Sequence, residues 1–119
     1  MSNDPGLFEI MGTTRAMRRL KLDPVPDELV QKILNAGIAA ANGGNRQRWR
    51  FLVVKDPEIK KRVQHFYKRA YDETIGPGYH SNTPGPGISQ EKYERQIKAV
   101  AYLTEHYHEA PVWIVACQE

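Results

Sequence analysis

The 119-residue sequence contains a single cysteine, Cys117, so it cannot form a disulfide within the chain. It also lacks any long apolar run, which argues against a membrane-spanning helix. Its first residues carry neither the basic nor the apolar segment of a signal peptide. From these absences we expect a cytoplasmic protein with no membrane partner. Because Cys117 lies in an apolar stretch, we expect its thiol to be buried and inert.

Several catalytic and cofactor motifs are also missing. No Gly-x-Gly-x-x-Gly occurs, so the sequence does not indicate a Rossmann nicotinamide site. His106 and His108 are two residues apart, which on a helix points them about 200° from each other. They therefore cannot share a metal ion there, and no third ligand is evident, so we predict no metal site. The order of the residues alone identifies no Ser-His-Asp or Cys-His arrangement.

The balance of charge is modest. Lysine and arginine exceed aspartate and glutamate by three, and 40% of the residues are hydrophobic. This composition and length fit one globular domain at most. The positive charge favours an anionic partner, which at this level is equally a nucleic acid, a membrane surface or a phosphorylated cofactor.

Hydrophobic periodicity and capping residues predict alternating helices and strands. We expect a short helix within residues 5–13, a helix from Pro26 to about Ala41, a strand over Trp49–Lys55, a helix capped by Asp56, a helix from Ser89 that ends before Pro111, and a strand over Val112–Cys117. The glycine- and proline-rich segment Ile75–Ile88 is predicted to be irregular, as an active-site lid or a disordered excursion.

The expected helices have apolar faces. The helix from Pro26 carries a stripe of apolar and small residues, and the helix after Asp56 carries an apolar stripe opposite a basic face. The stripes are Val30, Ile33, Leu34 and Gly37 in the first helix, and Ile59, Val63, Phe66 and Ala70 in the second. We predict that both stripes are buried and that the basic face is solvated.

A glycine- and amide-rich loop separates the second helix from the first strand. It contains two glycines, Gly43 and Gly44, that allow a backbone to approach a ligand closely. Its side-chain amides, Asn42, Asn45 and Gln47, can each donate and accept hydrogen bonds. The loop is compatible with a helix C-cap followed by a turn. It is equally compatible with a loop that binds a polar, planar cofactor.

Three arginines, Arg15, Arg18 and Arg19, lie within five residues of one another. Such a cluster is either an exposed basic turn or an anion site, because the planar guanidinium pairs well with phosphate.

Together these two segments resemble the nitroreductase family of flavin enzymes. The family's first motif runs Arg-Arg-Ser-hydrophobic-Arg-Arg-Phe and leads into an Asp-Pro-Val-Pro linker. Its second motif runs Pro-Ser-Gly-Gly-Asn-Arg-Gln-Pro-Trp and leads into a strand. The matching positions are Arg15, Met17, Arg18, Arg19, Asp23–Pro26, Gly43–Gln47 and Trp49. The sequence departs from the motifs at Thr14, Ala16, Ala41, Asn42 and Arg48, and Ala16 removes a serine that contacts phosphate in the family.

The resemblance implies an α+β fold in which a mixed sheet is flanked by helices, and a homodimer with FMN at its interface. It implies electron transfer from NAD(P)H through FMN to a small acceptor such as a nitroaromatic or a quinone, with no catalytic acid or base. It places Arg15 near the phosphate and Arg18 at the N1/O2 edge of the flavin. The implied cofactor-binding residues are Arg15, Ala16, Met17, Arg18, Asn42, Asn45 and Gln47.

Both predicted strands are apolar on both faces, and a two-stranded sheet cannot shield such surfaces. We therefore expect residues 1–119 to be the N-terminal portion of a single nitroreductase-like domain, truncated after the second strand. Two alternatives remain, a small basic nucleic-acid-binding or adaptor module and an inactive truncated remnant. The first is disfavoured because the aromatic residues are not interleaved with the basic ones.

Overall fold

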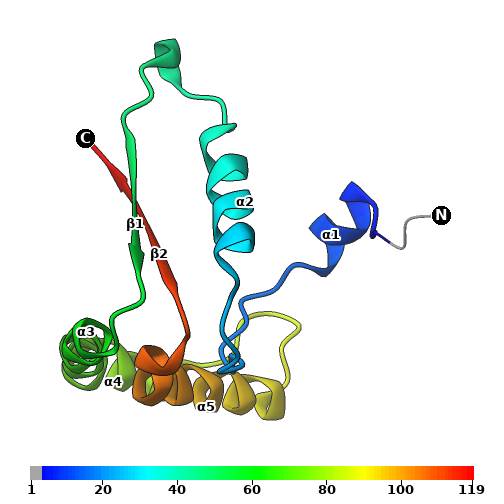
Figure 1. The fold of residues 1–119 in the computed structure, drawn as a ribbon. Helices are drawn as coiled ribbons and strands as arrows, with labels where there is room; N and C mark the ends of the chain where they lie inside the picture. Colours follow the sequence, from blue (N-terminus) through cyan, green and yellow to red (C-terminus); the bar gives the residue numbers. More distant parts are fainter. Residues whose placement is uncertain (1–3) are drawn as a thin grey trace.

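A two-stranded antiparallel sheet stands over a layer of helices in the computed structural model, which describes residues 4–119 (Figure 1). Strand β1 (Trp49–Val54) pairs with β2 (Trp113–Gln118), in a register that sets Trp49 opposite Gln118 and Val54 opposite Trp113. The α+β class predicted from the sequence is confirmed. Within residues 4–119 the sheet holds only these two antiparallel strands, so it does not itself display mixed strand directions.

Two helices precede the sheet. Helix α1 (Leu7–Thr13) stands apart from the other elements, whereas α2 (Asp27–Ile38) runs beside the strands (Figure 1). Gly37 lies against the Phe51 ring so closely that a Cβ atom there would come within 3.1 Å of it. The absence of a side chain at Gly37 therefore lets α2 approach β1 closely at this point.

Two expectations for α2 were wrong. The helix ends at Ile38 rather than near Ala41, because residues 43–45 form a separate 3₁₀ turn. Its apolar stripe is buried only at Val30, while Ile33 is 55% exposed. The rest of residues 4–119 covers this helix at few points, one of them being the contact between Gly37 and Phe51.

Helix α3 (Pro57–Ala70) begins where the sequence predicts. The Asp56 carboxylate accepts hydrogen bonds from the backbone N–H groups of Glu58 and Ile59, and Pro57 occupies the first helical position. The helix continues through a wider π-helical turn (Tyr71–Ile75) into α4 (Gly76–Ser81). The prediction of an irregular segment over Ile75–Ile88 was therefore wrong for its first half. Pro77 is the second residue of α4, directly after the wider turn.

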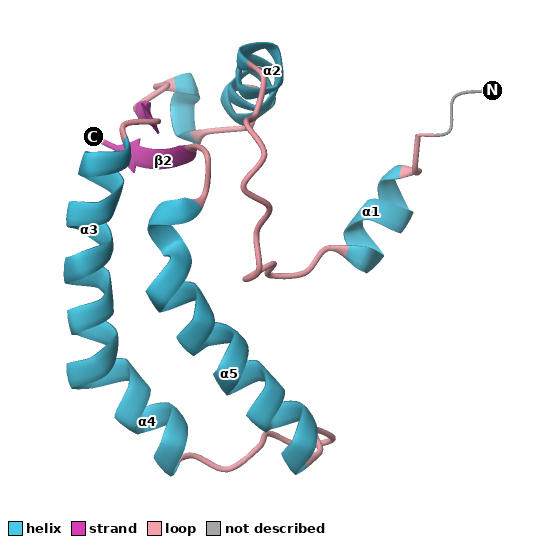
Figure 2. Cartoon of the chain, turned by 60° about the horizontal axis from the view of Figure 1, so that its bottom comes forward, coloured by secondary structure: helices cyan, strands magenta, loops and turns pink. Residues whose placement is uncertain are grey.

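Helix α5 (Gln90–His106) runs back alongside α3 and α4 (Figure 2). Its N-terminus is capped by the Ser89 hydroxyl, which accepts a hydrogen bond from the backbone N–H of Lys92. A 3₁₀ turn, Tyr107–Glu109, then connects α5 to β2.

The predicted burial of α3 was wrong for its apolar stripe and for Lys60, whereas Lys61, Arg62 and Arg69 of the basic face are exposed as predicted. Lys60 is 5% exposed, and its ammonium donates hydrogen bonds to the carbonyl oxygens of Ala110 and Pro111. Ile59, Val63 and Phe66 are instead 44–60% exposed. The carbonyls before β2 are hydrogen-bond acceptors that an apolar side chain could not satisfy, so the helix presents its polar face to them.

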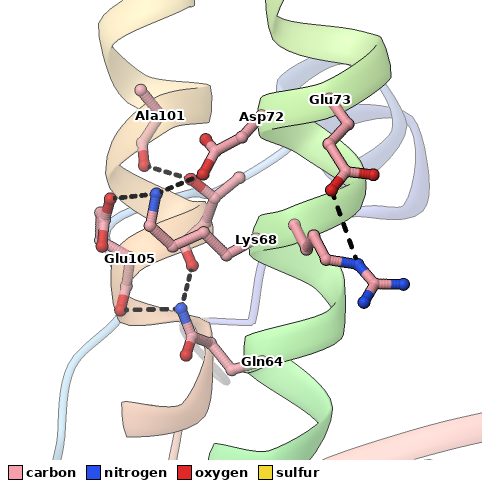
Figure 3. Close-up of polar contacts among 8 residues, drawn as sticks. Gln64, Lys68, Asp72, Glu73, Ala101 and Glu105 are labelled. Carbon is pink, nitrogen blue, oxygen red and sulfur yellow. Dashed lines mark hydrogen bonds and ion pairs between the residues drawn. The ribbon is translucent and has the colours of Figure 1, made fainter.

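Polar contacts also join α3 to α5 (Figure 3). The Gln64 amide donates to the Thr104 carbonyl at 2.6 Å, and the Lys68 ammonium lies 2.9 Å from Glu105 and 2.7 Å from Asp72. Hydrogen bonds to Asp72, and then to Glu105, raise the pKa of Lys68 above its ordinary value. These contacts align the two helices, in part through Lys68 of the basic face that the sequence predicted to be solvated.

The buried core is small. The buried apolar residues of the described range are Val30, Tyr71, Ala110 and Trp113. The Trp113 ring stacks on Tyr107 with 4.4 Å between ring centroids, and its Nε1–H donates to the Tyr107 carbonyl. The radius of gyration is 17.5 Å, against about 13.5 Å for a compact domain of this length. The described chain is therefore open in shape.

Both strands are exposed, as expected of a two-stranded sheet that cannot shield its apolar surfaces. Leu52 is 56% exposed and Val115 is 40% exposed, and Cys117 is half-buried rather than enclosed. The cause is that the sheet faces receive little cover from the rest of residues 4–119.

No helix in that range combines the length and the apolar character needed to cross a membrane.

Candidate functional site

The amide loop, residues 42–47, is held by hydrogen bonds between its own side chains. The Asn42 side-chain oxygen accepts from the backbone N–H of Gln47 at 3.0 Å, and the Gln47 amide donates to the Asn45 side chain, also at 3.0 Å. The predicted trio of amides is thus brought together. Each bond uses only part of an amide, so the remaining donors and acceptors are left for a ligand.

The backbone of the same loop adopts left-handed conformations. Gly44, Asn45 and Gln47 have φ values of 62°, 49° and 53°. Glycine and asparagine take this conformation readily, but glutamine does not. Such conformations persist where surrounding contacts enforce them, and they cluster at ligand sites.

Two cavities flank the amide loop. One, of about 520 Å³, lies between the loop and the end of β2 and is lined by Asn42, Gly43, Arg46, Arg48, Trp49 and Ala116–Gln118. The other, of about 420 Å³, lies toward the end of α2 and includes Asn45 and Gln47. Arg46 and Arg48 form no ion pair with any side chain of residues 4–119. The loop therefore offers amides and two uncompensated cations side by side.

The arginine segment, residues 15–19, lies across the other end of the molecule, near α5. The Arg19 guanidinium sits 4.0 Å above the Tyr102 ring, a cation–π contact. Arg18 makes only a long contact of 3.5 Å to the Ala16 carbonyl. Neither Arg15 nor Arg18 pairs with a carboxylate from the described range, so both remain available to an anion.

A third cavity, which we call the tyrosine cavity, lies between the arginine segment and the helices. It measures about 310 Å³ and is lined by Ala16, Met17, Arg18, Tyr67, Tyr71, Ile75, Tyr79, Val100 and Leu103. Three of the predicted cofactor residues thus border one cavity. The segment after α3 that was predicted to be an irregular lid also contributes to it, through Ile75 and Tyr79.

The structure does not bring the two predicted halves of the site together. The amide loop lies at one extreme of the chain and the arginine segment at the other, close to α5 (Figure 1). None of these three cavities contains residues from both segments. Within one copy of the described chain the two segments therefore lie apart.

The histidines show no metal-binding arrangement. The His106 ring lies 3.0 Å from the Glu109 carboxylate and stacks on Tyr102. Across the described range, no three His, Cys, Asp or Glu side chains are grouped as metal ligands.

Two features were missed at the level of sequence. Tyr71 lines a cavity, and Lys60 is buried. The spacing of Tyr67 and Tyr71, four residues apart on one helix face, was a signal for the tyrosine cavity. The burial of Lys60 left no such local signal, because its acceptors lie 50 and 51 residues away.

The fold is that of known flavoproteins. An iodotyrosine deiodinase structure, bound to FMN and 3-iodo-L-tyrosine, superimposes with a TM-score of 0.71 at 23% identity, over 96% of this chain and 57% of that one. A BluB-like flavoprotein from Clostridium difficile 630 superimposes with a TM-score of 0.63 at 24% identity, over 98% of this chain and 50% of that one.

The chain belongs to the Nitroreductase family, whose model matches residues 12–119. Relatives include an NADH dehydrogenase of Thermus thermophilus, 42% identical over 50 residues, and an iodotyrosine deiodinase 1 of Rattus norvegicus, 32% identical over 57 residues. These matches cover 42% and 48% of this chain, and 24% and 20% of the relatives. The chain thus spans about half the length of the solved flavoproteins. The aligned stretches cover a smaller share of the two relatives, about a quarter and a fifth of their lengths.

The family is FMN-dependent, which confirms the cofactor predicted from the sequence. The hydrogen-bond donors and positive charges of this chain suit FMN. Uncompensated arginines fit a phosphate, and the preorganised amides of the loop fit the carbonyl and nitrogen edge of a flavin ring. The assignment of Arg15, Ala16, Met17, Arg18, Asn42, Asn45 and Gln47 to the cofactor remains a prediction.

Proposed function

We propose that this chain is part of a cytoplasmic FMN-dependent oxidoreductase that takes electrons from NAD(P)H and passes them to a small acceptor such as a nitroaromatic or a quinone. The observation that carries the proposal is the amide loop, where side-chain amides are fixed by their own hydrogen bonds on a left-handed backbone beside two uncompensated arginines. Bound FMN supplies the redox chemistry of such an enzyme.

The chain's own residues bind and orient rather than transfer protons. Arg15 provides a guanidinium for the phosphate, and Arg18 provides positive charge at the ring edge, where it favours the reduced, anionic form. The Ala16 side chain cannot donate a hydrogen bond, so at this position only the backbone contributes. Asn42, Asn45 and Gln47 present amides that are already positioned, which lowers the entropic cost of binding.

We further propose that two copies of the chain form a homodimer and share each flavin. The amide loop and the arginine segment lie apart within one chain (Figure 1). A twofold axis would set the loop of one copy beside the arginine segment of the other, and repeat the arrangement at a second, equivalent site.

The amide loop is tested by Asn42→Ala. This change removes the acceptor for the Gln47 backbone N–H and frees the loop. Losing one hydrogen bond together with the preorganisation is expected to weaken FMN binding by roughly 5- to 20-fold. Titration of FMN, followed by quenching of its fluorescence, measures the change.

The matched control is Asn35→Ala. Asn35 is an exposed asparagine of α2 whose side chain bonds only Gln31. FMN affinity should be unchanged in that variant. If the Asn42→Ala variant and the unmodified chain bind FMN with equal affinity, the proposal that the amide loop binds the flavin is contradicted.

A further inference from the structure

The arginine segment is joined to the rest of the chain by few polar contacts. No backbone hydrogen bond links residues 15–22 to another part of residues 4–119, and none of their cations pairs with a described carboxylate. Leu20 and Leu22, which border α5, are 47% and 65% exposed. Burial therefore adds little to hold a segment that carries Arg15 and Arg18, the two arginines assigned to the cofactor.

The specific contact comes from Arg19, which matches the family motif but has received no role in the site. Its guanidinium lies 4.0 Å from the centre of the Tyr102 ring, in the geometry of a cation–π contact. The Arg19 side chain is exposed, so close packing does not force it onto the ring. The attraction between the cation and the ring therefore accounts for its position.

The ring that Arg19 contacts is itself fixed. Tyr102 stacks on His106, one turn later on α5, with 4.1 Å between ring centroids and 20° between the ring planes. The His106 Nδ1 atom lies 3.0 Å from a carboxylate oxygen of Glu109. Tyr102 thus belongs to a row of contacts that runs from Arg19 through two rings to a carboxylate. A helical residue braced in this way is a firm attachment point for a loosely held segment.

Fixing Arg19 restricts the arginine next to it. Consecutive Cα atoms are about 3.8 Å apart, so the backbone of Arg18 cannot move far while Arg19 stays on the ring. The side chain of Arg18 makes only the long contact with the Ala16 carbonyl, so its own interactions do not hold it. Restricting the segment before a ligand arrives lowers the entropic cost of binding that ligand.

We propose that Tyr102 is a positioning residue of the cofactor site. By holding Arg19, it keeps Arg15 and Arg18 in place for an anionic ligand without touching that ligand itself. The identity of the ligand as FMN rests on the proposed function, whereas the anchoring of the segment by Tyr102 does not.

Two substitutions of Tyr102 test the role of its ring. Tyr102→Leu removes the aromatic face and keeps an apolar side chain on the helix. Loss of an exposed cation–π contact corresponds to about 2- to 5-fold in affinity, so FMN should bind more weakly by that factor. Tyr102→Phe retains the aromatic face and should bind FMN as the unmodified chain does. If both variants weaken binding equally, the aromatic face has no positioning role and the proposal is overturned.

Arg19→Gln tests whether Tyr102 acts through Arg19. This variant should also bind FMN about 2- to 5-fold more weakly, and the double variant with Tyr102→Leu should bind no more weakly than either single variant. Lys21→Gln, which removes an exposed cation two residues away, controls for the lost charge and should have a smaller effect than Arg19→Gln. Losses that multiply in the double variant would show that Arg19 and Tyr102 act independently, which would contradict the proposal.

Backbone order parameters from nuclear magnetic relaxation of the flavin-free 119-residue chain separate this proposal from the proposed function. Residues 15–20 should have values of about 0.85 in the unmodified chain and in Tyr102→Phe, and below about 0.6 in Tyr102→Leu. Equal order in all three proteins would overturn the anchoring, whether or not FMN binds. If the segment loosens only in Tyr102→Leu while the unmodified chain fails to bind FMN, the anchoring by Tyr102 is supported and the flavin assignment falls.

Discussion

Arg18→Ala is expected to weaken FMN binding by roughly 10- to 100-fold, the largest effect of any single change in the predicted cofactor set. A hydrogen bond between a guanidinium and a charged group contributes about 1.5–3 kcal/mol. Arg18 has no carboxylate partner in residues 4–119, so its whole charge is available to the ligand. The variant should also slow reduction of bound FMN by NAD(P)H, since less positive charge would face the ring edge. Fluorescence titration and stopped-flow absorbance measure the two effects.

Lys21→Ala is the matched control for Arg18→Ala. Lys21 is an exposed cation three residues away, and it makes no ion pair with the part of the chain that the structure describes. Both changes lower the net charge by one, so any general attraction for an anion decreases equally. A loss of FMN affinity that is the same in both variants would deny Arg18 a specific role.

The second large effect concerns stability. Lys60→Ala is expected to lower the free energy of unfolding by about 2–4 kcal/mol. The change leaves the Ala110 and Pro111 carbonyls without their donor, and it opens space where a 5%-exposed side chain was packed. Because these carbonyls lead directly into β2, the pairing of the strands should loosen as well. Urea denaturation followed by circular dichroism measures the loss.

The neighbouring residue provides the comparison. Lys61 is exposed on the same helix, and its substitution by alanine should change stability by no more than about 0.5 kcal/mol. If the two lysine variants unfold at the same urea concentration, then the contact of Lys60 with the turn before β2 contributes nothing to the fold.

The features that the sequence predicted well are local ones. Asp56 caps its helix as expected, because a capping bond forms within two or three residues of the cap. The helix predicted from Ser89 begins at Gln90, directly after it. Both strands were predicted from short apolar runs, with boundaries within one or two residues. The contacts between the amides of residues 42–47 are local too, which is why the loop could be singled out before its geometry was known.

The features that the sequence missed depend on residues far away along the chain. Periodicity showed that α3 has an apolar and a polar face, but which face packs inward depends on acceptors near residue 110. The glycines and prolines of residues 76–86 were taken as helix breakers, although Pro77 sits where a helix tolerates it. The tyrosine cavity joins residues from three separate segments, so no local pattern could reveal its shape.

The central claim, that two copies share each flavin, is tested most directly by mixing two defective variants. Arg18→Ala and Asn42→Ala each damage every site of their own homodimer. Subunit exchange in an equal mixture would create dimers with one intact site and one doubly damaged site. We predict that FMN titration of this mixture recovers tight sites, at about a quarter of the total, while neither variant alone shows them. A mixture that binds FMN no more tightly than the separate variants would contradict the shared site.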